Sequence, residues 1–392
     1  MARHIAAGID VGTHAVRVVI AELLNADGKV APKIIGTGLI ESKGLRHGYI
    51  VNSPEVTRCI RGALEQAQKA AQLHIKRAYL SVGGVGLSSF ISQGGATITR
   101  ADSEVTELDV SRALESAEKD IPAGVVLNRK VVHAVPLSFK IDGKQVLGRP
   151  QGMKGTKLEV RVLFVTCLEQ HLNDLIAAIN DAGVEVDDVM ASPLAASLVT
   201  LNKAQKIAGC VLANIGAETV SIAVFENNIP ISLEVFPIGS TDITHDIALG
   251  MKVPLEDAEK MKRGTWNNSD TPKKKLDEII KARLNDIFEL IDAHLKKIGR
   301  NELLPAGIVV TGGGSGIASI DDIARVALKL PAKKASYIFD SGSRISMQDS
   351  TWAVAFGLCI LGLTQDEEPA LGFRIMKNAQ QGIMSWIKQF LP

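Results

Sequence analysis

The sequence predicts an α/β fold made of two related lobes, and three observations support this prediction. The segment Gly8–Ile20 reappears in looser form as Ala213–Val224, with Asp10 aligned to Asn214. Each copy reads as an apolar strand, a small polar turn around a glycine and an alternating strand, which is typical of a tight β-hairpin. Each hairpin is followed by helical segments and a return strand, the order of an α/β layer architecture. At 392 residues, the chain also exceeds the usual size of a single core.

The first part of lobe I is expected over residues 1–84. Strands over residues 5–40 lead to a helix over Pro54–Leu73, because apolar residues recur there at helical spacing. The apolar run Ala78–Val82 predicts the return strand, which ends at Gly83 and Gly84. This order places the return strand parallel to the first one.

Residues 85–162 differ in pattern and are expected to form an inserted small α+β subdomain. It contains alternating strands, including one over Lys130–Phe139, and one helix. The second part of lobe I follows over residues 163–204. It is expected to contain a strand at Leu163–Cys167 that resumes the parent sheet, and then a helix over His171–Ala182.

The second half repeats this plan. A hairpin over Val211–Val224 and a strand near Ile231–Val235 form the first part of the lobe II core, residues 205–239, and Gly307–Thr311 is the return strand. The apolar run Ala353–Leu363 is too short to cross a bilayer and predicts a buried helix. The other expected segments are a mostly helical insert over 240–304, the second part of the lobe II core over 305–345, a helix returning to lobe I over 346–364 and a linker over 365–374.

The last segment, residues 375–392, is expected to be an amphipathic helix. At about 100° per residue, its apolar side chains fall within one arc, and a tryptophan and basic residues accompany them. This pattern is typical of a helix that lies in a membrane surface. The alternative is a C-terminal helix docked on the protein's own core. The predicted membrane-binding residues are Ile383, Met384, Trp386, Ile387, Lys388, Phe390 and Leu391.

Composition excludes some classes of protein. A net charge of +1 gives no global positive field, so nucleic acid is not an expected partner. Four cysteines lie far apart without a CxxC pair, which predicts buried, reduced thiols and a cytoplasmic protein. The eight histidines show no metal-ligand spacing.

The repeated turns carry the main functional signal. Backbone amides on a glycine-containing turn can converge on a phosphate, because no Cβ blocks the approach. Two such turns on two related lobes therefore suggest one nucleotide clamped between them.

Together with Thr311–Gly314 and the segment Ala258–Lys262, the paired hairpins resemble the actin-like ATPase superfamily. Within it, the chain resembles the FtsA family of bacterial division proteins, which link the FtsZ ring to the membrane. The resemblance extends from about Ile5 to Leu391. It implies an actin-like, ribonuclease H-like duplicated two-lobe fold, with a small α+β insert in the first lobe and a helical insert in the second. Further segments that carry it are Lys43–Gly48, Ile141–Gly155, Val165–Cys167, Ala282–Leu284, Ala306–Gly313 and Trp386–Lys388.

The resemblance implies ATP and Mg²⁺ as cofactors. Asp10 would hold Mg²⁺ through water, and the two turns would bind the phosphates. The phosphate-binding residues implied are Asp10, Gly12, Thr13 and His14 in lobe I, and Gly216, Ala217, Glu218 and Thr219 in lobe II. The adenosine-binding residues implied are Glu259, Lys262, Gly312, Gly313 and Gly314. A helix-face ion pair between Glu259 and Lys262 is the alternative for those two residues.

The resemblance also implies partners. The first insert would contact a neighbouring copy in a filament, and the second insert, around Arg283, would receive the C-terminal peptide of FtsZ. An outward-facing arginine suits a peptide with acidic residues, although a solvated helix arginine remains the alternative. The tail would bind an anionic membrane surface. These features imply a peripheral protein on the cytoplasmic face of the cell membrane, at the division site, that also meets other division proteins.

The second hairpin departs from the family pattern, which has an acidic residue and a glycine run there. Asn214 cannot act as a general base or anchor a metal-bound water as a carboxylate does. Ala217 and Glu218 restrict the turn, and Glu218 is expected to bring negative charge near the phosphate. We therefore expect ATP binding with slow or absent hydrolysis, and the sequence assigns no catalytic residue.

Two other functions fit the same superfamily. A type IV pilus assembly protein of the inner membrane also has an acid-poor second hairpin, but it usually lacks a lipid-binding tail. A small-molecule kinase needs a carboxylate base facing an acceptor pocket, and the sequence shows no segment that supplies one.

Overall fold

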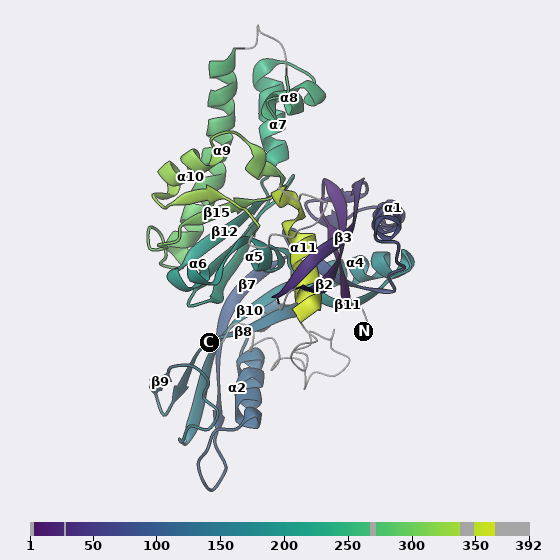
Figure 1. Cartoon of the computed structure of the whole chain (residues 1–392). Helices are drawn as coiled ribbons and strands as arrows, with labels where there is room; N and C mark the ends of the chain where they lie inside the picture. Colours follow the sequence, from purple (N-terminus) through teal and green to yellow (C-terminus); the bar gives the residue numbers. More distant parts are fainter. Residues whose placement is uncertain (1–3, 27–28, 267–271, 338–348, 365–392) are drawn as a thin grey trace.

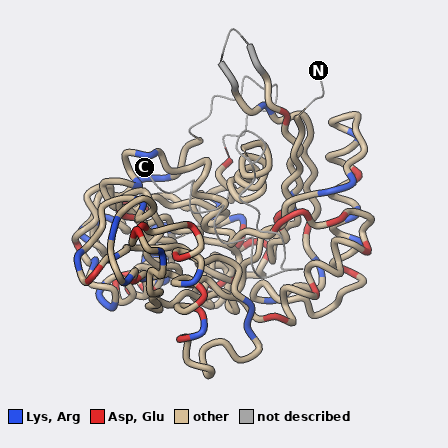
Figure 2. Tube along the Cα trace, turned by 90° about the horizontal axis from the view of Figure 1, so that it is seen from below, with Lys and Arg blue, Asp and Glu red and all other residues tan. Residues whose placement is uncertain are grey.

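The structure is a computed structural model that describes residues 4–26, 29–266, 272–337 and 349–364. It shows two α/β lobes side by side, with an arm of long strands below them and a group of helices projecting above (Figure 1). Lysine and arginine are interspersed with aspartate and glutamate along the described trace (Figure 2).

Lobe I is built on a five-stranded sheet in the order β11-β6-β1-β2-β3. The hairpin of β1 and β2 is antiparallel, and the return strand β6 is parallel to β1, as predicted. Helix α1 lies against β3, where Gly38 leaves no room for a side chain: a Cβ there would lie 1.8 Å from the carbonyl oxygen of Ala63. The strands are β1 (Ile5–Val11), β2 (Ala15–Ala26), β3 (Lys29–Glu41), β6 (Arg77–Val82) and β11 (Glu185–Ala191), and the helices α1 (Ser53–Ala71), α4 (Glu169–Asp181) and α5 (Ser192–Thr200).

Lobe II repeats this topology in a sheet with the order β14-β13-β12-β15-β16. β12 and β13 form an antiparallel hairpin, and β15 returns parallel to β12, just as β6 returns beside β1. The predicted duplication is therefore confirmed. The strands are β12 (Cys210–Ile215), β13 (Val220–Glu226), β14 (Ile229–Phe236), β15 (Ile308–Thr311) and β16 (Ala332–Lys334), and the helices α6 (Lys203–Ala208), α7 (Ser240–Met251), α8 (Leu255–Lys262), α9 (Lys273–Lys297) and α10 (Ile320–Leu328).

The arm is a four-stranded sheet, β7-β10-β8-β9, with helix α2 against it. The predicted strand at Leu163–Cys167 exists, but its assignment to the parent sheet was wrong. It is the end of β10, whose ladder partners are β7 and β8 throughout. Its side chains Leu163, Val165 and Cys167 nevertheless pack into the core of lobe I. The elements are β7 (Ser88–Thr97), α2 (Glu107–Lys119), α3 (Ala123–Val126), β8 (Arg129–Ile141), β9 (Lys144–Val146) and β10 (Lys157–Leu168).

Helix α11 (Ala353–Thr364) lies near the centre of Figure 1 and packs on β1, β2 and α5. Its residues Ala353–Leu363 are all buried, as predicted. All four cysteines are free and buried, which confirms that prediction too. Among the described residues, no helix combines the length and apolar character needed to cross a membrane. The predicted tail, 375–392, lies outside the described residues, as does the linker 365–374.

Candidate functional site

The two repeated turns have the same local structure. In lobe I the backbone N–H of Gly12 donates to the carbonyl oxygen of Ala15 at 3.2 Å, and in lobe II that of Gly216 donates to Thr219 at 2.9 Å. A Cβ on Gly12 would lie 3.1 Å from the Ala15 carbonyl oxygen, and a Cβ on Gly216 would lie 3.0 Å from the Thr219 carbonyl oxygen. Both turns are therefore closed tightly around a residue that tolerates crowding.

Both turns open into one cleft between the lobes, with a volume of about 1020 Å³. Lobe I contributes the ends of β1 and β6 and the start of α5, and lobe II contributes α7, α8 and the segment after β15. The structure thus brings together most residues that the sequence predicts for a nucleotide site. Those that line the cleft are Asp10, Gly12, Thr13, His14, Gly216, Ala217, Thr219, Glu259, Lys262, Gly312 and Gly313.

Asp10 is the residue before the last one of β1, and it lines the cleft. Its carboxylate Oδ1 accepts a hydrogen bond from the Ser81 hydroxyl at 2.7 Å. Burial raises the pKa of Asp10, while the Ser81 hydrogen bond and the nearby Arg17 guanidinium oppose this rise. The Ser81 hydrogen bond therefore orients the Asp10 carboxylate, and the charge of Arg17 favours its ionised form.

Arg17 is a cleft residue that the sequence reasoning missed. It stands opposite Asp10 in the β1–β2 ladder and lines the cleft, with its guanidinium 5.9 Å from the Trp352 ring centroid. Val16 and Val18 on either side are fully buried. A charged residue between two apolar ones, just after the glycine turn, is the signal that could have identified it, because alternation places it on the opposite face from its neighbours.

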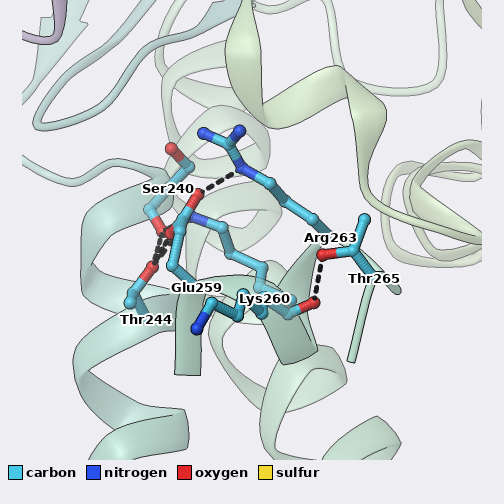
Figure 3. Close-up of polar contacts among 7 residues, drawn as sticks. Ser240, Thr244, Glu259, Lys260, Arg263 and Thr265 are labelled. Atoms are coloured by element: carbon cyan, nitrogen blue, oxygen red, sulfur yellow. Dashed lines mark hydrogen bonds and ion pairs between the residues drawn. The ribbon is translucent and has the colours of Figure 1, made fainter. Parts of the chain in front are cut away.

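Glu259 and Lys262 form an ion pair inside a wider polar network. The Glu259 carboxylate binds Lys262 Nζ at 2.6 Å and accepts hydrogen bonds from the Thr244 hydroxyl at 2.6 Å and Arg263 Nε at 2.7 Å (Figure 3). Partial burial raises the pKa of Glu259, but the hydrogen bonds from Lys262, Thr244 and Arg263 outweigh it and lower the pKa to about 2. Burial lowers the pKa of Lys262, and Glu259 opposes this. The helix-face pair left open by the sequence is present, at the rim of the same cleft.

We expect Glu259→Gln to lower the free energy of unfolding at pH 7 by about 1 kcal/mol, a modest value because the side chain is 34% exposed. The folded-state pKa lies below the ordinary value, so the stabilisation is present above about pH 4.5 and is lost as the pH falls toward 2. Urea denaturation from pH 7 to pH 3 measures this. Glu256→Gln, on the same helix, is the matched control. An equal loss of stability in the Glu259→Gln variant at pH 7 and pH 3 would contradict the assignment.

Two predicted nucleotide residues do not line the cleft. Gly314 is buried against Ile215, and a Cβ there would lie 2.4 Å from Ile215 Cγ2, so its lack of a side chain serves packing. Glu218 turns toward lobe I, where its carboxylate accepts a hydrogen bond from the backbone N–H of His47. The structure thus directs the Glu218 carboxylate to His47, and Glu218 is not among the residues that line the cleft.

Asn214 is the residue before the last one of β12, at the position equivalent to Asp10, and it lines the cleft. Its side-chain oxygen lies against Gly312, where a Cβ would approach it to 2.2 Å. The amide offers a hydrogen-bond donor and acceptor but no carboxylate. Within the described part of the chain, no three acidic, histidine or cysteine side chains gather into a metal site. Asp10 alone still fits Mg²⁺, since this ion commonly takes one or two carboxylates and fills its remaining positions with water and substrate phosphates.

Arg283 does not face outward as a free cation. From α9, its guanidinium binds both carboxylate oxygens of Asp246 on α7, at 2.6 and 3.0 Å, and reaches Asp286 at 3.3 Å. Two carboxylates therefore balance its charge, because a bidentate arginine–carboxylate pair is a strong one. The surface around Arg283 combines both signs of charge.

The duplicated sheets, with a cleft between their glycine turns, define an actin-like ATPase fold. A solved chain of the "PilM-PilN type IV pilus biogenesis complex" matches with a TM-score of 0.67 and 17% identity, covering 91% of this chain and 98% of that one. MreB5 of Spiroplasma citri bound to AMPPNP matches with a TM-score of 0.52 and 13% identity, covering 93% and 97%. At these identities the matches show the fold.

The sequence comparisons are more specific. The family model for "Cell division protein FtsA" matches residues 211–357, and the model for the "SHS2 domain inserted in FTSA" matches residues 84–166. The cell division protein FtsA of Neisseria meningitidis serogroup B is 30% identical, over 89% of this chain and 88% of its own length. That of Pseudomonas aeruginosa is 28% identical, over 92% and 90%. The chain belongs to the FtsA family and has an actin-like role in cell division.

Proposed function

We propose that this protein binds ATP in the cleft, polymerises on the cytoplasmic face of the cell membrane and tethers FtsZ filaments there during division. The observation that carries the proposal is that two turns, related by the duplication, face one cleft of about 1020 Å³. Converging turn amides suit the phosphates of a nucleotide.

In this proposal the phosphates lie between residues 12–14 and residues 216–219, and adenosine lies toward α8 and Gly312. Asp10 would hold Mg²⁺ through water, and the ion would neutralise phosphate charge when bound. The Glu259 carboxylate and Lys262 Nζ already form an ion pair with each other. In this proposal they therefore contact the nucleotide as a fixed pair rather than as two mobile side chains. Hydrolysis is slow or absent, because Asn214 cannot take a proton from water.

FtsZ binding is assigned to the surface formed by Asp246, Arg283 and Asp286. An acidic peptide alone would have to displace carboxylates from Arg283, so a segment that carries both charges fits this surface better. This refines the expectation of a purely acidic peptide.

Each tail attaches the protein to the membrane only weakly, and assembly into a filament makes this attachment strong. One amphipathic helix binds lipid only modestly, whereas many tails on one filament multiply the effect. ATP would favour the closed arrangement of the lobes that fits the next copy.

Co-sedimentation with anionic vesicles tests the proposal. We expect the intact chain to sediment with vesicles and to carry an FtsZ C-terminal peptide with it. Deletion of Lys377–Pro392 should leave soluble filaments that no longer sediment with lipid. Trp386→Glu, on the apolar arc, should act like the deletion, and Gln389→Ser, on the polar side, is the matched control.

The outcomes separate the parts of the proposal. Undiminished vesicle binding by the truncated chain would refute the tail assignment. Retention of the FtsZ peptide by Arg283→Ala, with normal vesicle binding, would refute only the peptide surface. Absence of filaments with Mg²⁺ and ATP would refute polymerisation.

A type IV pilus assembly role is the second candidate. It is favoured by the structural match to the pilus biogenesis complex over 91% of this chain. Lipid-dependent recruitment of the FtsZ peptide would decide against it, because the predicted tail has no place in that role.

A further inference from the structure

Glu218 connects the two lobes across the edge of the cleft. Its carboxylate Oε2 accepts a hydrogen bond from the backbone N–H of His47 at 2.5 Å. The His47 ring Nδ1 lies 3.3 Å from the backbone carbonyl oxygen of Glu218 and 4.0 Å from the carboxylate. These contacts join residues 171 positions apart in the chain, one on each lobe. We call them the Glu218–His47 contact.

The lobe I side of this contact is fixed by its backbone. His47 lies in the turn between β4 (Leu45–Arg46) and β5 (Tyr49–Ile50), and it has a positive φ of 49°. Gly48 packs so closely on Gly84 that a Cβ would lie 2.5 Å from the Gly84 Cα. Gly84 follows β6, so the turn is anchored to the strand that also supplies Ser81 to the cleft.

The lobe II side is equally fixed. Ser240 N–H donates to the Gly216 carbonyl oxygen at 2.9 Å, and Thr241 N–H donates to the Ala217 carbonyl oxygen at 2.8 Å. The turn that carries Glu218 is thereby bonded to the first residues of α7. Because α7 also holds Thr244 in the polar network with Glu259, a displacement of Glu218 would move this wall of the cleft.

We propose that Glu218 is a latch that holds the two lobes together at the edge of the cleft. The carboxylate lies on the lobe I turn, so the negative side chain is kept away from the phosphate position while its backbone neighbours face the cleft. An alanine in its place would remove the hydrogen bond between the Glu218 carboxylate and the His47 backbone N–H. Closure at this edge of the cleft would then depend on the nucleotide, while α5 would still contact β12 and β13 of lobe II.

Hydrogen exchange of the full chain without nucleotide tests the latch, since the His47 amide itself is the donor. We expect Glu218→Ala to speed exchange of the segment 44–50 by about tenfold or more, because a hydrogen bond to a charged group is lost. Glu218→Gln should show a smaller increase, because its amide oxygen can still accept. Glu226→Gln is the matched control: Glu226 lies on the same hairpin but pairs with Arg300 within lobe II.

Exchange in α2, on the distant arm, reports whether a variant remains folded. Faster exchange at 44–50 in the Glu218 variants, with α2 and the Glu226 control unchanged, supports the latch. Exchange at 44–50 within twofold of the wild type overturns it. If Glu218→Ala also exposes α2, the Glu218→Gln variant decides by the same criteria.

A second arm adds ATP and Mg²⁺ and rests on the proposed function. ATP should restore slow exchange at 44–50 in Glu218→Ala, because it binds the closed arrangement. If ATP protects neither the wild type nor the variant, nucleotide binding fails while the nucleotide-free result for the latch stands. A further outcome is that ATP protects the cleft of the wild type while Glu218→Ala, without ATP, exchanges at 44–50 at the wild-type rate. In that case the latch alone fails.

Discussion

Replacing Arg17 by methionine is expected to weaken binding of ATP by about 10- to 100-fold, the value of a charge-assisted hydrogen bond. Arg17 lines the cleft and pairs with Asp10 in the β1–β2 ladder. Its Nε is buried and makes no hydrogen bond to any residue that the structure describes. Arg17 is only partly buried and lines the cleft, so its charged guanidinium can bind an anion there without first breaking a hydrogen bond from Nε.

Calorimetric titration with ATP and Mg²⁺ measures this effect. Arg17→Lys is the matched control, because it keeps the charge but not the planar fork, and we expect an intermediate affinity. Wild-type affinity in the methionine variant would show that Arg17 does not reach the nucleotide. The same wild-type samples report turnover, and hydrolysis at the rate of an efficient ATPase would contradict the role given to Asn214.

The repeat was the part of the fold that sequence could predict best. A hairpin with a glycine turn has a local signature, and two copies at a constant offset require related surroundings. The closing hydrogen bonds of Gly12 and Gly216 confirm that both copies form the same turn. Helix α11 was also predictable, since a continuous apolar run such as Ala353–Leu363 has to be buried.

Sheet membership was less predictable than strand formation. The alternation in β10 specifies a strand, but it does not specify which strands will pair with it. Lys157–Leu168 is one strand that packs against two cores: Leu158 and Val160 contact the arm, whereas Leu163 and Val165 contact lobe I. The predicted boundary at residue 162 cuts this strand in two, because it assigns one half to the insert and the other half to lobe I.

The direction of side chains was the least predictable feature of the site. The sequence placed Glu218 in a phosphate turn, but the direction of its carboxylate depends on His47, which lies 171 positions away. Arg283 was expected to face outward, but its orientation depends on Asp246 on another helix. Such pairings follow from tertiary structure, which has no signature in the local sequence.

The close packing of α11 on α5 gives the second large expected effect. A Cβ on Gly357 would lie 1.9 Å from the carbonyl oxygen of Ala195 and 2.5 Å from its carbonyl carbon. Both atoms belong to backbone, so the two helices would have to separate. The pair lies at the centre of the molecule, where α5 also touches β12 and β13 of lobe II (Figure 1).

We therefore expect Gly357→Ala to lower the free energy of unfolding by about 2 kcal/mol, since overpacking of a tight core outweighs the better helix propensity of alanine. Gly124→Ala is the matched control, because nothing lies within 4 Å of a Cβ at that helical position. Thermal and urea unfolding of both variants measure the difference. Equal stability of the two variants would contradict this expectation, because it would show that α5 and α11 can separate without cost.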